Sequence, residues 1–103
     1  MRAEAEQVEA VARLWDAHLQ ADFPGHMRGA DPLGIDMVLL DATIAGCVSS
    51  WLHDRGSLDH GRRVILARCL AGLDRVLPIL SGQQEHAYYD RLRAMTVATL
   101  GIP

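Results

Sequence analysis

The stretch from Leu33 to Gly56, LGIDMVLLDATIAGCVSSWLHDRG, constrains the fold more than any other part of the chain. Read as a helix, it is apolar on almost every side, and its apolar part holds a single acid, Asp41. A helix without a wholly polar face is expected in the interior of a fold rather than on its surface. The sequence therefore predicts a central helix that the other elements enclose.

Three further segments repeat apolar residues at the three- and four-residue spacing of amphipathic helices. Gly56 and Ser57 predict a tight junction, with glycine closing one helix and serine capping the next. Pro78 should end the third helix, and the pattern Ser81-Gly82-Gln83-Gln84 resembles the capping box that opens a fourth. The four predicted helices cover about residues 3–22, 35–55, 58–77 and from 81–84 to 100.

These elements predict an all-α single domain over residues 1–103. An antiparallel four-helix bundle is the natural solution for four amphipathic helices with two short connections. A bundle-like globular packing of the same helices is the alternative, because the apolar faces are wider than a coiled-coil seam. Residues 24–35 form the one long connection, and loops of this length are often functional. A short helical turn is expected at Asp31-Pro32.

Composition excludes several classes of function. The formal charge is −3 and no basic cluster is present, so the chain lacks the electrostatic footprint of a nucleic-acid-binding protein. The N-terminal residues lack the apolar core of a signal peptide. Asp36, Asp41 and Asp54 interrupt the longest apolar run, so no membrane span and a cytoplasmic location are predicted. Because half of the residues are apolar, some apolar surface is expected to be covered by a second copy or a partner.

Asp41 is the first candidate binding residue. A carboxylate that leaves water must be paired, hydrogen-bonded or protonated. If the second and third helices form a hairpin about Gly56-Ser57, Asp41 lies level with Gly72, one turn from Arg68 and Arg75. An Asp–Arg strut between the helices is therefore predicted, with an acid in a binding pocket as the alternative. Arg68 and Arg75 become candidate binding residues with it.

Trp51 is the fourth candidate binding residue, because tryptophan anchors many interfaces and Trp51 lies near the open end of its helix. Cys47 and Cys69 fit best as buried free thiols, since two cysteines do not make a disulfide framework. His18 and His26 are expected at the surface.

Metal and catalytic motifs are missing from the sequence. His53 and His60 flank the turn HDRGSLDH, which is more typical of solvated helix caps than of a zinc site, and whether these two histidines bind metal stays open. There is no phosphate-binding loop and no nucleophile elbow. We therefore predict no metal, no cofactor and no catalytic residue.

The function predicted from the sequence is non-catalytic binding by a small helical protein that forms a homodimer. Two alternatives stay open. One is a small-molecule site within the bundle, in a sensor or a minor enzyme, with a pocket near Asp41 and Trp51. The other is a protein with one specific protein partner, such as an immunity or regulatory factor. A cavity that reaches Asp41 would favour the first alternative, and a flat acidic and aromatic surface would favour the second.

Overall fold

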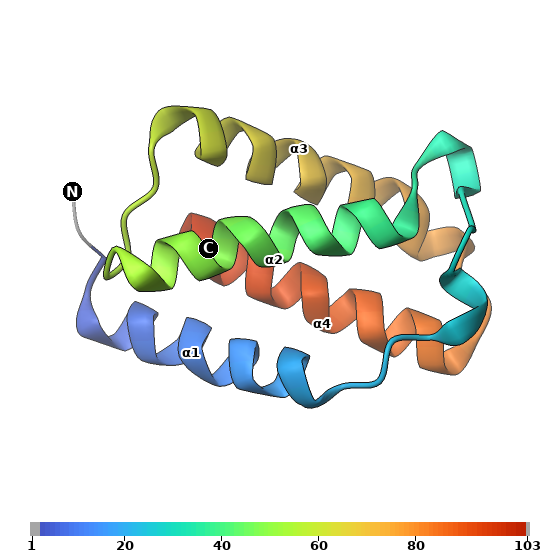
Figure 1. The fold of residues 1–103 in the computed structure, drawn as a ribbon, viewed down its shortest axis with the longest axis horizontal. Coiled ribbons are helices and arrows are strands. Elements are labelled where there is room, and N and C mark those ends of the chain that lie inside the picture. Colours follow the sequence, from blue (N-terminus) through green and yellow to red (C-terminus); the bar gives the residue numbers. More distant parts are fainter. Residues whose placement is uncertain (1–2, 103) are drawn as a thin grey trace.

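The computed structural model describes residues 3–102, which form an all-helical bundle (Figure 1). Successive α-helices alternate in direction, and the described residues contain no strand. This confirms the predicted all-α, bundle-like fold. The α-helices are α1 (Ala5–Gln20), α2 (Met37–His53), α3 (His60–Val76) and α4 (Gln83–Leu100), and the connections contain the 3₁₀ turns Gly25–Met27, Pro32–Gly34 and Leu77–Ile79.

Three acidic side chains set the helix N-termini. Asp36 accepts a hydrogen bond from the Leu39 N–H at 3.0 Å and opens α2, and Asp59 accepts one from the Arg62 N–H at 3.1 Å and opens α3. Glu85 reaches back to accept from the Gly82 N–H at 2.7 Å and closes the first turn of α4. The predicted caps Ser57 and Ser81 were wrong, because carboxylates two and four residues further along satisfy the free N–H groups instead.

At the α2–α3 junction the predicted role of Gly56 is confirmed. Gly56 has a φ of 93°, and its N–H donates to the Trp51 carbonyl at 2.7 Å. A Cβ at this position would lie 2.5 Å from the Cβ of Ala3, so only glycine fits the turn without a shift. At the other end, α3 stops at Val76, just before Pro78.

The most enclosed helix is α4, which packs against the other three and passes behind α2 in Figure 1. The prediction that α2 holds this central place was wrong. The inner side of α2 is buried against the other three helices, but its outward side stays exposed because no described element covers it. We call this exposed side the outer face of α2, and it comprises Leu39, Ala42, Gly46 and Ser49.

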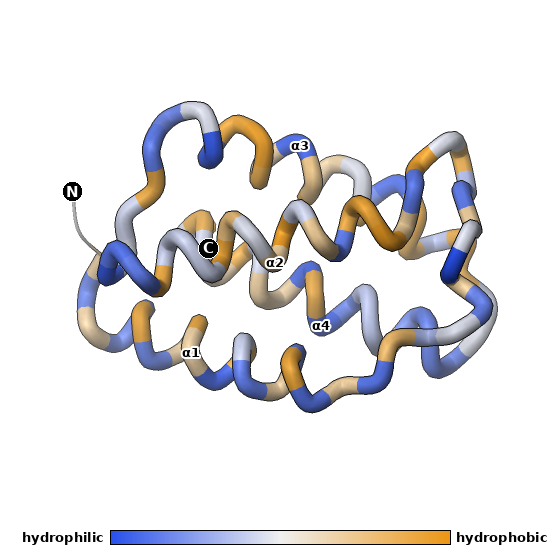
Figure 2. Tube along the Cα trace, in the orientation of Figure 1, coloured by the Kyte–Doolittle hydropathy of each residue, from blue (hydrophilic) through white to orange (hydrophobic). Residues whose placement is uncertain are grey.

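Hydropathy distinguishes α2 from α1. Figure 2 shows α1 alternating between polar and apolar residues, whereas α2 is largely apolar or neutral. Within the described residues, one segment, Pro32–His53, is long and apolar enough by composition to cross a membrane, with a mean hydropathy of 1.5. The aspartates that were expected to exclude a span do not exclude it by this measure. Core helices of soluble proteins meet the same criterion, but only 28% of the apolar 18-residue window within this segment is buried in the fold.

Candidate functional site

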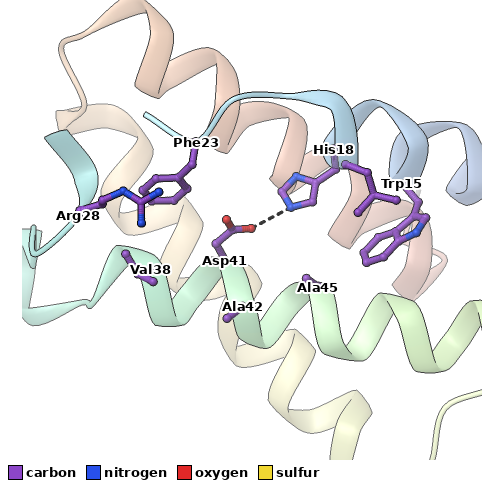
Figure 3. Close-up of a pocket in the computed structure, with 9 residues that line it drawn as sticks. Trp15, His18, Phe23, Arg28, Val38, Asp41, Ala42 and Ala45 are labelled. Atoms are coloured by element: carbon purple, nitrogen blue, oxygen red, sulfur yellow. Dashed lines mark ion pairs between the residues drawn. The ribbon is translucent and has the colours of Figure 1, made fainter. Parts of the chain in front are cut away.

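A groove of about 300 Å³ lies between α1 and α2, near the end of the bundle where the 21–36 connection joins them. Two aromatic side chains, Trp15 and Phe23, form parts of its walls, and two alanines of α2 lie along its floor (Figure 3). We call this hollow the α1–α2 groove. Its lining consists of Trp15, His18, Leu19, Phe23, Arg28, Val38, Asp41, Ala42 and Ala45.

Asp41 is the only acid in the lining, and three elements meet at its carboxylate. The Tyr88 hydroxyl of α4 donates to Oδ2 at 2.6 Å, and His18 Nε2 of α1 lies 2.9 Å from Oδ1. The side chains of His18 and Asp41 are only 10% and 14% exposed. Oδ1 is buried and accepts no hydrogen bond of good geometry, so the His18 contact is mainly electrostatic and is an ion pair when the imidazole is protonated. The carboxylate therefore connects α1, α2 and α4.

The predicted arginine partners of Asp41 were wrong. Arg68 and Arg75 are exposed and line a different hollow of about 420 Å³, on the opposite side of α2. Each residue in an α-helix is turned by about 100° from the last. Leu40 therefore faces α3, and Asp41 faces α1 and α4. The hairpin register gave the right position of Asp41 along the axis of α2. It did not give the side of α2 on which Asp41 lies.

Trp51 does not belong to the groove. It is 2% exposed, so the suggested contact with something outside the chain is wrong, and it adjoins a small depression beside Gln7 and Arg63. A pocket that reaches Asp41 is present, as the small-molecule alternative expects, but Trp15 supplies its tryptophan.

His18 and His26 were expected at the surface, and the structure gives both an acidic partner. His26 is 60% exposed, yet its Nε2 contacts Oε2 of Glu85, whose side chain is only 8% exposed. His18 lies three residues after Trp15 and seven after Val11, so its place on the apolar side of α1 was readable from the sequence. The partner of His26 was not readable, because it depends on the path of the 21–36 connection.

Arg28 lies at the mouth of the groove. Its guanidinium carbon is 5.2 Å from the centre of the Phe23 ring, a cation–π distance. Figure 3 shows Arg28 and Phe23 on one side of Asp41, with His18 and Trp15 on the other. Among the described residues, Arg28 forms no ion pair with an acid.

The two neighbouring tyrosines of α4 have buried hydroxyls with partners. Tyr88 donates to Asp41, and Tyr89 donates to the Met37 carbonyl at 2.9 Å. Burial raises the pKa of Tyr88 well above its usual range, and the hydrogen bond to Asp41 raises it further. Burial and the charge of Asp41 raise the pKa of Tyr89 in the same direction. Both hydroxyls therefore remain protonated donors at neutral pH.

The remaining reactive groups lie outside the groove. Cys47 and Cys69 are free and buried, as predicted, and burial raises the pKa of each thiol. Among residues 3–102, no group of three or more histidines, cysteines and acids is arranged to hold a metal ion. The groove lining contains no serine, threonine or cysteine, so it offers a carboxylate, an imidazole and aromatic faces but no side-chain nucleophile.

A scan against models of known protein families finds no match, and searches of curated proteins and of solved structures find no significant relative.

Proposed function

We propose that this chain is a small non-catalytic binding protein that works as a homodimer, paired through the outer face of α2. The observation that carries the proposal is the exposed apolar surface along this helix. Leu39 is 61% exposed and Val38 beside it is 40% exposed. Across the α1–α2 groove, Leu19 is 62% exposed. Large exposed apolar patches mark interaction sites on soluble proteins, and these three side chains are among the exposed large hydrophobic residues of the described part of the chain.

The absence of charge on the outer face permits a second copy as its occupant. The chain carries a net charge of −3, so two copies repel one another at long range. The residues of the outer face are uncharged, and the one acid within α2, Asp41, points into the groove instead. Two outer faces can therefore meet about a twofold axis without bringing like charges together.

The geometry of α2 also suits self-pairing. Ala42 and Gly46 lie near the middle of the helix, and a Cβ added at Gly46 would meet nothing within 4 Å. Small residues at the crossing point let two helices approach at the short end of the usual 8–10 Å range. The face seen in Figure 1 spans 37 × 26 Å, which has room for the roughly 800 Å² that each partner buries in a standard interface.

Sedimentation equilibrium tests this proposal. We expect the purified chain to sediment with twice the mass of one chain, and the variant Leu39→Glu to sediment as a monomer. Leu39 is the third residue of α2 after its cap Asp36. The negative charge of a glutamate at this position interacts favourably with the helix dipole. Loss of the dimer in this variant would therefore not follow from loss of the helix, and circular dichroism checks that the helix is kept.

The matched control is Ile79→Glu, which also places a glutamate at an exposed aliphatic residue but lies in the turn after α3. It should stay dimeric. A monomeric wild-type chain at high concentration would refute the proposal, and so would a Leu39→Glu variant that remains dimeric.

A further inference from the structure

The α1–α2 groove has the dimensions and lining of a small-ligand site. Its volume of about 300 Å³ is at the lower end of the range for such sites. The aromatic rings of Trp15 and Phe23 and the small side chains of Ala42 and Ala45 leave an apolar slot beside a single carboxylate (Figure 3). An apolar slot with a few convergent polar groups is the usual construction of a ligand pocket.

The Asp41 carboxylate has unused capacity as an acceptor. An ionised carboxylate offers about four acceptor positions. Asp41 receives one well-aligned hydrogen bond, from Tyr88, together with the close contact of His18. A largely buried carboxylate with few hydrogen bonds is costly to maintain. Asp41 also lines the groove with a side chain that is 14% exposed, and because Oδ1 is buried, a donor on a ligand reaches Oδ2 there.

The groove favours a cation over an anion. Aromatic faces attract cations, and the chain already places one, the Arg28 guanidinium, over Phe23 at the mouth. Arg28 is exposed and comes from the 21–36 connection, so it can move aside. Arg28 pairs with no acid among the described residues, whereas a ligand cation bound between the Phe23 ring and Asp41 would have both the aromatic face and the carboxylate as partners.

We propose that the α1–α2 groove binds a small organic cation, a protonated primary amine on an apolar body about the size of one aromatic ring. The ammonium group donates to Asp41, and the apolar body lies between Trp15 and the alanine floor. Tyr88 and His18 hold the carboxylate in position. Asp41 and Ala45 lie outside the outer face of α2, but Ala42 belongs to both the groove and that face, so the site is also tested in the monomeric variant.

The test uses 2-phenylethylamine as the probe, with 2-phenylethanol as its neutral analogue and phenylacetate as an anion of similar shape. The two indole N–H resonances in an NMR titration provide the readout. Trp15 lines the groove, whereas Trp51 is buried elsewhere and serves as an internal control. We expect the amine to shift the Trp15 resonance in a saturable way, with a Kd at least about tenfold lower than that of the alcohol.

Four variants make the result specific. Asp41→Asn should weaken amine binding to the level of the alcohol, whereas Asp90→Asn, the same change at an exposed site on α4, should leave it unchanged. Arg28→Ala should tighten binding of the amine, because it removes a competing cation. Ala45→Leu keeps the carboxylate but fills the groove, so it should abolish amine binding. If Asp41→Asn does not fold, this variant tests the site in its place.

Three outcomes would overturn the proposal. Equal binding of amine and alcohol would show an apolar cleft in which Asp41 has no role. Tighter binding of phenylacetate, weakened by Arg28→Ala, would show an anion site. An unshifted Trp15 resonance at about 10 mM amine, a concentration far above the Kd of a specific site, would show no site at all. The monomeric Leu39→Glu variant should still bind the amine, so a failure of the dimer proposal does not decide this test.

Discussion

Two grooves run along opposite sides of α2, and they differ in what they offer. The α1–α2 groove has aromatic walls and a largely buried carboxylate held by Tyr88 and His18. The second groove, between α2 and α3, is larger at about 420 Å³. It is aliphatic apart from one thiol, with Arg68 and Arg75 at its edge, both exposed. We call it the α2–α3 groove, and its lining is Ile35, Leu40, Ile65, Arg68, Cys69, Ala71, Gly72 and Arg75.

The difference shows that size alone does not make a site. In the first groove the polar groups converge on one carboxylate that connects three helices. In the second, the two arginines lie one above the other on α3 without an acid as partner among the described residues. The first has the features of a binding pocket, and the second has those of an underfilled seam between helices. Three predictions test this distinction.

The largest expected effect is alkaline destabilisation on the α1–α2 side. In the fold, Tyr88 and Tyr89 have raised pKa values, whereas an unfolded tyrosine ionises near pH 10. The stability that these tyrosines contribute is complete below about pH 10 and is lost as the pH rises above it. Each tyrosine should lower the free energy of unfolding by about 1.4 kcal/mol per pH unit in that range.

Urea unfolding between pH 9 and 11 measures this effect, and Tyr88→Phe isolates one contribution. This variant should lose about 2 kcal/mol at neutral pH, because a carboxylate loses its hydrogen bond, and its stability should fall less steeply above pH 10. Ile65→Val, a change at a residue of the α2–α3 groove that does not titrate, is the control and should keep the wild-type steepness there. Equal steepness in wild type and Tyr88→Phe would contradict the buried role of this hydroxyl.

The sequence was sufficient for the helices but not for the rotation of α2. Apolar spacing, Gly56 and Pro78 located the elements and two of their ends. The hairpin register predicted that Asp41 and Arg68 are neighbours, because it gives the position of each residue along the helix axis. That argument cannot fix rotation, which depends on how all the helices pack at once. The need of a buried Tyr88 for a partner was visible in the sequence, but the identity of that partner required the fold.

The second prediction concerns packing in the α2–α3 groove. A Cβ at Gly72 would lie 3.7 Å from Ile35 Cδ1 and 3.8 Å from Leu40 Cδ1, which are ordinary contact distances. Gly72→Ala should therefore fill part of the seam and remove the cost of glycine within a helix, raising the free energy of unfolding by about 1 kcal/mol. Urea unfolding measures the change. A loss of stability would mean that the seam has no room, and then the two grooves are less different than proposed.

The smallest expected effect is that of the two arginines. Because Arg68 and Arg75 are exposed and unpaired among the described residues, replacing either with alanine should change the free energy of unfolding by less than about 0.5 kcal/mol. The double-mutant cycle of Arg68→Ala with Asp41→Asn is the decisive measurement. Here the two changes should add, since the residues lie on opposite sides of α2. A coupling energy well above about 0.5 kcal/mol would restore the strut between Asp41 and an arginine and would remove the distinction between the two grooves.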